Sequence, residues 1–156
     1  MPYEPSSEAA IQAMLQLAQL RREDLVYDLG CGDGRVVIAA VRGSGARGIG
    51  VDLDPKLLRQ AQANAVQAGV SKRVSFRAQD LFETDLRQAS VVLLFLWPEI
   101  NQRLLPKLLR ELPAGARVVS NMHDMGDYAP TRRITLREGA RPHHVYLWVV
   151  PARPLK

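Results

Sequence analysis

Residues 26–35 read VYDLGCGDGR, and this stretch decides the fold that the sequence predicts. Its first half is a short apolar run typical of a buried strand, and its second half is a glycine-rich turn. Three glycines, Gly30, Gly32 and Gly34, permit a tight turn and the close approach of a ligand to the backbone. The stretch therefore predicts a strand that leads into a ligand-binding turn, with a helix beyond it.

Outward from this turn, apolar runs alternate with stretches of helical spacing along most of the chain. Strands are expected at residues 25–29, 47–51, 74–77, 91–96 and 117–120. Helices are expected from Ser6 or Ser7 to Leu20, from Arg35 to Arg42, from Asp54 to Gly69, and from Pro98 onward, with Pro106 kinking or splitting the last. Strand–helix alternation of this kind predicts a parallel sheet with helices on both faces.

The end of the chain departs from the alternation. Residues 131–136 and 145–150 are strand-like runs with too short a loop between them for a helix, so they should pair as an antiparallel hairpin. His143 and His144, just before the second run, are interpreted as turn or surface residues, because neighbours in a strand make a poor metal pair. The prediction is therefore an α/β, doubly wound, seven-stranded sheet, mostly parallel with a C-terminal hairpin.

Acidic residues follow three of the expected strands and gather at one edge of this sheet. Asp28 ends the first strand and Asp33 lies within the glycine turn, where both carboxylates suit a cationic ligand. Asp52 ends the second strand and is placed to accept both hydrogen bonds of a ribose diol. Asp80 follows the third and could accept a bond from an adenine amine. Four neighbours complete the expected nucleoside site: Cys31, which is expected to fill space, and Leu53, Gln79 and Leu81.

A dinucleotide fingerprint is the main alternative for such a turn. The pattern G-x-G-x-x-G would place its third glycine at position 35, which is Arg35. Two carboxylates beside the turn would also repel a pyrophosphate. A nucleoside with a cationic tail, S-adenosylmethionine, fits the acidic edge better than a dinucleotide.

The motifs DLGCGDG, VDLDP and QDLF together resemble the class I S-adenosylmethionine-dependent methyltransferases, over most of the chain. PYEPSS, LWPEIN and GARVVSNMHDMGDYAP are similar to a small family whose eukaryotic members methylate lysines of ATP synthase subunit c and of the adenine nucleotide translocase. The resemblance implies a Rossmann-like fold, S-adenosylmethionine as cofactor, S-adenosylhomocysteine as product, and protein-lysine N-methylation.

Five residues are expected on the acceptor side. Trp97, Glu99 and Asn101 follow the fourth strand, His123 follows the fifth, and Tyr3 lies in a segment, residues 1–7, that could close the site as a lid. Trp97 and Tyr3 would wall a lysine stem, while Glu99 or His123 would orient the amine or accept its proton. Glu99 equally suits the first turn of an ordinary helix.

Other functions remain open at this level: a small-molecule or rRNA methyltransferase, or a catalytically silent cofactor-binding module. The segment LWPE lacks the leading Asn or Asp that enzymes methylating amino groups of bases often carry, which disfavours base N-methylation. Arginines of the final hairpin could bind RNA or an acidic surface. With no aromatic residues between them in sequence, a solvated sheet edge is preferred.

Composition bounds the remaining possibilities. With 156 residues, 47% hydrophobic and 24% charged, the chain is expected to form one domain, residues 1–156. The net charge is +5, and the single cysteine excludes an internal disulfide and a cysteine zinc cage. No metal is expected. Without a long apolar run or a signal peptide at its start, the chain is expected to be cytoplasmic.

Overall fold

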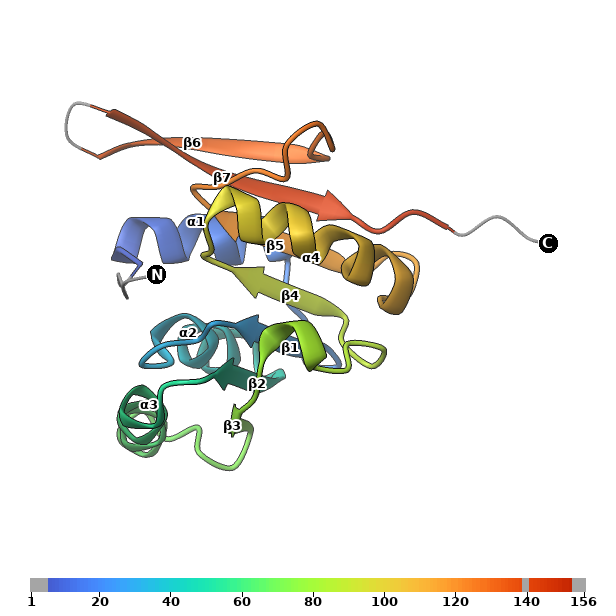
Figure 1. Cartoon of the computed structure of the whole chain (residues 1–156). Helices are drawn as coiled ribbons and strands as arrows, with labels where there is room; N and C mark the ends of the chain where they lie inside the picture. The colour runs from blue at the N-terminus through green and yellow to red at the C-terminus, as the bar shows by residue number, and fades with distance from the viewer. Residues whose placement is uncertain (1–5, 139–140, 153–156) are drawn as a thin grey trace.

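The computed structural model describes residues 6–138 and 141–152, which build a seven-stranded sheet in the order β3-β2-β1-β4-β5-β7-β6 (Figure 1). β1 to β5 run parallel, whereas β7 pairs antiparallel with both β5 and β6. The predicted mostly parallel sheet with a terminal hairpin is confirmed. The strands are β1 (Leu25–Leu29), β2 (Arg47–Asp52), β3 (Val74–Ala78), β4 (Val91–Leu94), β5 (Arg117–Asn121), β6 (Arg132–Glu138) and β7 (Arg141–Val149).

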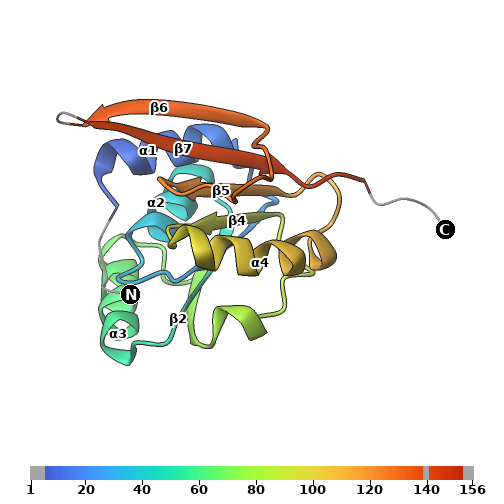
Figure 2. The same ribbon diagram turned by 45° about the horizontal axis from the view of Figure 1, so that its top comes forward.

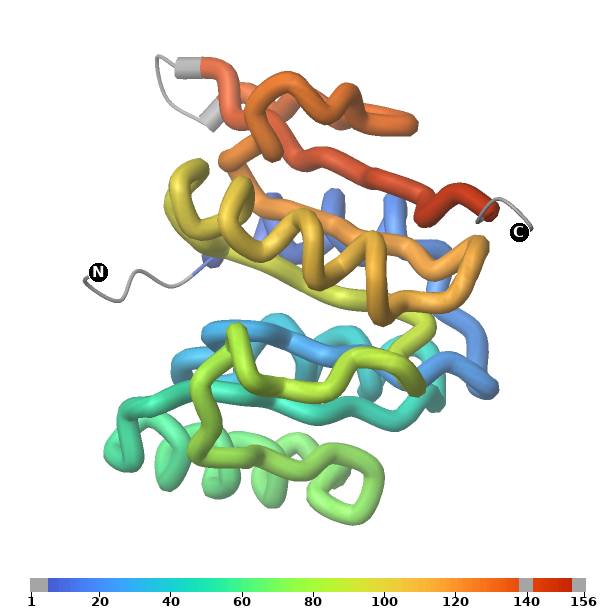
Figure 3. Tube along the Cα trace, turned by 45° about the vertical axis from the view of Figure 1, so that its right-hand side comes forward, coloured from blue at the N-terminus to red at the C-terminus, as the bar shows by residue number. Residues whose placement is uncertain are grey.

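Helices cover both faces of the sheet. Figure 3 shows α4 in front of the sheet and α1 and α2 behind it, and Figure 2 shows the β6–β7 hairpin along one edge. The connection from β3 to β4 holds only the short 3-10 helix η1, on the same face as α4. The helices are α1 (Glu8–Ala18), α2 (Arg35–Ser44), α3 (Pro55–Gln67), η1 (Leu81–Glu83) and α4 (Pro98–Glu111).

The helix ends form where the sequence indicates. The Ser7 side chain accepts a hydrogen bond from the Ala10 N–H at 3.2 Å, and the Asp54 side chain caps α3 ahead of Pro55. Gly45 ends α2 in the left-handed conformation, with φ of +77°. These caps satisfy backbone groups that a helix end leaves free, and so they fix where each helix meets the sheet.

Three sequence predictions need correction. β4 ends at Leu94 instead of Leu96, because β1 and β5 offer no partners beyond it. Pro106 does not split α4. Because proline has no N–H, the Gln102 carbonyl receives no hydrogen bond from it, but both residues lie on the exposed side of the helix. The hairpin is longer than expected and takes both histidines into β7; His143 is buried and not a turn or surface residue.

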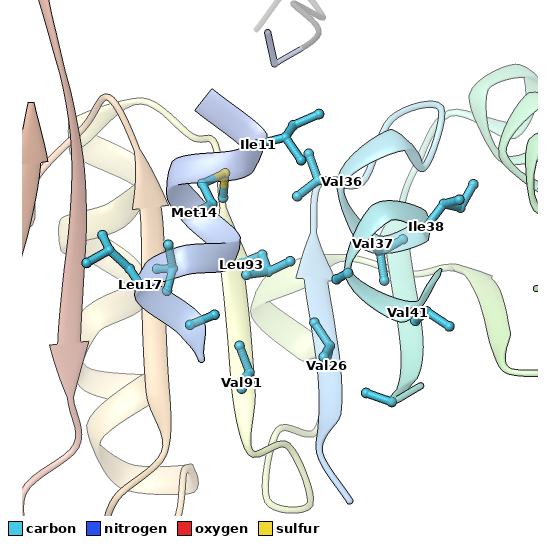
Figure 4. Packing of buried hydrophobic residues seen from close by; sticks show 14 of the residues in the cluster. Ile11, Met14, Leu17, Val26, Val36, Val37, Ile38, Val41, Val91 and Leu93 are labelled. Carbon is cyan, nitrogen blue, oxygen red and sulfur yellow. The ribbon is translucent and has the colours of Figure 1, made fainter. Parts of the chain in front are cut away.

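Two apolar layers hold the sheet, one on each face. Figure 4 shows the layer between the sheet and helices α1 and α2. Met14 and Leu17 of α1, Val37 of α2, and Val26 and Leu93 of the strands belong to it. Side chains of α4, such as Leu104 and Leu108, fill the opposite layer. Because both faces of β1 and β4 are covered, their carboxyl ends are rigidly placed.

We predict that Gly48→Ala lowers the free energy of unfolding by about 1–3 kcal/mol. A Cβ at this position of β2 would lie 2.6 Å from Val37 Cγ2 and 2.9 Å from Val41 Cγ2, so α2 would have to move. Gly43→Ala, in α2, is the matched control: nothing lies within 4 Å of its Cβ, and it should raise stability by about 0.5–1 kcal/mol. Urea unfolding of both variants measures this; equal effects would contradict the packing.

Candidate active site

The glycine turn joins β1 to α2 at the point where the strand order reverses. Gly30, Gly32 and Gly34 have φ values of +79°, +56° and +82°, which disfavour any side chain there. The N–H groups of Gly30 and Cys31 both donate to the Val51 carbonyl, at 2.8 and 2.9 Å. The turn is therefore bound to β2, and ligands of such sheets sit beside it.

Asp28 lies beneath this turn and is 5% exposed. Its Oδ2 is buried, with no hydrogen-bond partner among the residues that the structure describes. Burial raises the pKa of Asp28 to about 7; the backbone N–H of Val37 lowers this pKa, and the charges of Asp52 and Asp33 raise it. A cationic group bound next to this oxygen would stabilise the charged form of Asp28.

The carboxylates of Asp52 and Asp33 have different partners. Asp52 Oδ2 accepts from the Gly32 N–H at 2.9 Å and Oδ1 from the Asp54 N–H at 3.0 Å, so each oxygen keeps a second lone pair for a ligand. The carboxylate of Asp33 instead forms an ion pair with Arg35 at 2.8 Å. The structure thus places Asp52, more than Asp33, for hydrogen bonds to a ligand.

A cavity of about 410 Å³ opens between the ends of β2 and β3 and the start of α4. This volume is in the range of small-molecule sites. Five lining residues were predicted from the sequence beside Gly30, namely Asp52, Leu53, Gln79, Asp80 and Leu81, while the sequence analysis missed Val51, Phe82, Ile100 and Arg103.

The missed residues form one wall of this cavity. The Arg103 guanidinium lies 4.4 Å from the centre of the Phe82 ring. Ile100 and Arg103 are three residues apart on α4, so they share a helix face, a spacing that could have indicated them. Asp80 Oδ1 accepts from the Phe82 N–H at 2.8 Å and so begins η1.

Cys31 fills space beneath the turn. It is 6% exposed, and a Cβ built on Gly50 would lie 2.8 Å from its sulfur, so the thiol faces β2. Burial, with the charge of Asp28 beside it, raises the pKa of the Cys31 thiol far above its usual range. A thiol held protonated in this way is inert, which agrees with a packing role.

Aromatic rings gather beyond the carboxyl ends of β4 and β5. The centres of the Trp97 and His123 rings are 5.4 Å apart, and the Phe95 ring stacks on His123 at 6.2 Å. Trp97 is 43% exposed, as is Met122, whose φ of +72° turns the chain after β5. The structure thus brings Trp97 and His123 together, with Trp97 exposed and His123 half-buried.

The remaining acceptor-side residues are placed differently. Asn101 is fully buried, and its amide donates to the carbonyls of His123 and Asp124, each at 3.1 Å, so it holds this loop against α4. Glu99 is exposed in the first turn of α4. Tyr3 lies outside the described residues.

A buried polar chain, absent from the sequence analysis, anchors the segment before α1. Asn121 Nδ2 donates to Ser6 Oγ at 3.1 Å, and Asn121 Oδ1 is hydrogen-bonded to the ring of His143. The start of the described chain is therefore fixed to the end of β5, beside the loop that carries His123. These contacts join residues that are far apart in the sequence, so the sequence pattern does not indicate them.

Comparison with known proteins identifies the family. A model described as the ANTKMT methyltransferase domain matches residues 28–132, more than half of the chain. The chain belongs to this family of methyltransferases. Its fold, the glycine turn and the acidic strand ends agree with that assignment.

Individual relatives agree as well. The chain is 38% identical over 151 residues to the protein-lysine N-methyltransferase of Saccharolobus islandicus, covering 96% of this chain and 94% of the relative. It is 38% identical over 130 residues to the adenine nucleotide translocase lysine N-methyltransferase of Mus musculus, covering 83% of this chain and 56% of the relative. The chain therefore spans only about half the length of that mammalian relative.

A similar solved structure indicates which cofactor the chain uses. The RNA methyltransferase of Salinibacter ruber in complex with S-adenosyl-L-homocysteine superposes with a TM-score of 0.91, at 44% identity over 98% of this chain and 97% of that one. This protein is accordingly an S-adenosylmethionine-dependent methyltransferase. The buried, unpartnered oxygen of Asp28 and the cavity at Asp52 fit the cationic and nucleoside parts of that cofactor.

Two kinds of feature are missing from the part of the chain that the structure describes, a membrane-spanning helix and a metal-binding cluster. No helix in it is long and apolar enough to cross a membrane. It contains no group of three or more histidine, cysteine, aspartate or glutamate side chains that could hold a metal ion.

We predict that the stability of the cofactor-free enzyme falls relative to Asp28→Asn as pH rises from about 4 to about 7. Folding raises the pKa of Asp28 from 3.8 to about 7, so within this window the folded state binds more protons than the unfolded state. The asparagine has no such titration. Urea unfolding of both proteins at several pH values measures the difference; parallel curves would contradict the burial of an unpaired carboxylate.

Proposed function

We propose that this enzyme transfers the methyl group to lysine side chains of a protein. The observation that carries the proposal is the near full-length match to a protein-lysine N-methyltransferase, 94% of that relative. The open aromatic surface at Trp97 and His123 supports it, because an exposed site admits a side chain of a macromolecule.

The site offers a candidate residue for each of three parts of the cofactor. We assign the Asp28 carboxylate to the cationic end, the free lone pairs of Asp52 to the ribose diol, and Asp80 to the adenine amine. Leu53 and Leu81 border the cavity and would pack against the adenine ring. Gly30 and Gly32 let the backbone approach the ligand.

The reaction is a displacement at carbon. S-adenosylmethionine, when bound, supplies a methyl group activated by its sulfonium. The lone pair of a neutral lysine amine forms the new N–C bond, while the C–S bond breaks with its electron pair left on sulfur. The nitrogen then loses a proton, which Glu99 or His123 would accept. What the protein contributes is alignment of the amine and its protection from water.

The aromatic surface would make the lysine reactive. Trp97 and Phe95 offer apolar area to the aliphatic stem, and removing water from the ammonium favours its neutral form. Asn101 would act indirectly: by binding the carbonyls of His123 and Asp124, it positions the imidazole.

RNA is the second candidate acceptor, because the structural relative with a TM-score of 0.91 is described as an RNA methyltransferase. The two acceptors are separated by transfer of labelled methyl from S-adenosylmethionine into fractionated cell extract. We expect label in protein, on lysine, after acid hydrolysis. Label confined to the RNA fraction would overturn the proposal while leaving the cofactor site unaffected.

We predict that Glu99→Gln and His123→Ala bind S-adenosylhomocysteine within about twofold of the wild type, and that at least one loses most methyl transfer to the labelled protein. Neither side chain lines the nucleoside cavity, so cofactor affinity should not depend on them. Calorimetry measures the first quantity and labelled transfer the second. Full activity in both variants would remove these residues from the reaction.

A further inference from the structure

Strand pairing creates an aromatic and basic surface on the β6–β7 hairpin, at the edge of the sheet (Figure 1). Arg133 lies opposite Tyr146, and Thr135 lies opposite His144, so their side chains share one face. Thr135 Oγ1 and His144 Nδ1 are hydrogen-bonded at 2.9 Å. We call this surface, with Arg137 two residues beyond Thr135, the hairpin face.

The hairpin face carries unbalanced positive charge. Arg133 and Arg137 are exposed, and neither forms an ion pair with any side chain that the structure describes. Burial raises the pKa of Tyr146, the nearby charge of Asp124 raises it further, and the charge of Arg133 lowers it. With two arginines and one nearby carboxylate, guanidinium N–H groups on this face can still bind the carboxylates of a partner.

The hairpin face continues into the aromatic surface of the acceptor side. The Met122 N–H donates to the His144 carbonyl at 2.7 Å, and Met122 precedes His123 in the chain. β7 runs antiparallel to β5, so its first residues lie at the same end of the sheet as Trp97 and His123. The hairpin face therefore lies next to the aromatic surface at this end of the sheet.

We propose that the hairpin face docks an acidic segment of the protein substrate, next to the lysine that is methylated. This inference rests on the proposed lysine acceptor. Guanidinium groups of Arg133 and Arg137 would bind Asp or Glu side chains in bidentate pairs. Docking of this kind supplies affinity at a distance from the reacting amine and restricts which lysines reach it.

The packing of the rings favours a protein segment over RNA. Base stacking needs open ring faces. Tyr146 is half-buried between the rings of His144 and Trp148, with centres 5.9 and 5.7 Å away, and Trp148 is 3% exposed. The rings pack against one another, and the exposed arginines are the charged groups that the surface presents.

The experiment compares two lysine peptides, one flanked by glutamates and aspartates and one by glutamines and asparagines. For the double variant Arg133→Glu/Arg137→Glu, we expect KM for the acidic peptide to rise at least about tenfold with kcat unchanged, and no change for the neutral peptide. The preference for the acidic peptide should also shrink as salt rises from about 50 to about 300 mM.

Arg132→Glu is the matched control, because Arg132 is exposed on the same strand, pairs with Leu147 and lies on the opposite face. It reverses the charge of one arginine on the same strand, where the double variant reverses two, and it should leave both KM values unchanged. An equal effect from Arg132→Glu, or no preference for the acidic peptide, would overturn the docking site.

Peptide binding measured by fluorescence anisotropy separates the two proposals. If neither peptide is methylated but the acidic one still binds through Arg133 and Arg137, the lysine acceptor is wrong and the docking surface stands. If the double variant instead loses binding of a single-stranded RNA and retains that of the acidic peptide, the hairpin face is an RNA surface.

Discussion

A buried carboxylate oxygen that has no hydrogen-bond partner among the described residues is the constraint on which this site depends. Asp28 ends β1 under the glycine turn, and its Oδ2 is shielded from water. Such a group is costly to keep in a folded protein, and the raised pKa of Asp28 expresses that cost. In the proposed assignment, the cationic end of S-adenosylmethionine offsets this cost, which would account for a buried carboxylate at the end of β1.

The rest of the structure holds this carboxylate and the acceptor side in fixed relation. β1 and β4 are neighbours at the strand-order reversal, and both are covered on two faces. Asn101 ties the loop after β5 to α4, while Asn121 ties Ser6 to His143. Buried amides thus fix the loops around the proposed acceptor side, a degree of order that alignment of a nucleophile requires.

Sequence patterns predicted the features that depend on neighbours along the chain. The glycine turn, the caps at Ser7 and Asp54, and the acidic residues after β2 and β3 each follow from local chemistry. Positions set by distant contacts were missed. β4 stops at Leu94 because its neighbours stop, and Arg103 joins the cavity because α4 folds back over β4 and β5.

The hairpin shows the same limit most clearly. In the sequence its arginines have no aromatic residues between them, yet the register of β6 and β7 sets Arg133 beside Tyr146. The sequence predicts His143 and His144 as turn or surface residues. Because side chains alternate along β7, His143 is buried against Asn121 and His144 lies beside Thr135. Pairing partners across a sheet cannot be read from spacing alone.

The central claim is that Asp28 is reserved for the cationic end of the cofactor, and its carboxyl carbon reports this directly. We would follow the ¹³C shift of Asp28 by NMR against pH, with and without S-adenosylhomocysteine, using Asp28→Asn to assign the signal. The account predicts a midpoint near 7 in the free enzyme and a clearly lower one in the complex, because the ligand ammonium favours the carboxylate. An ordinary aspartate midpoint in the free enzyme, or one that the ligand leaves unchanged, would contradict it.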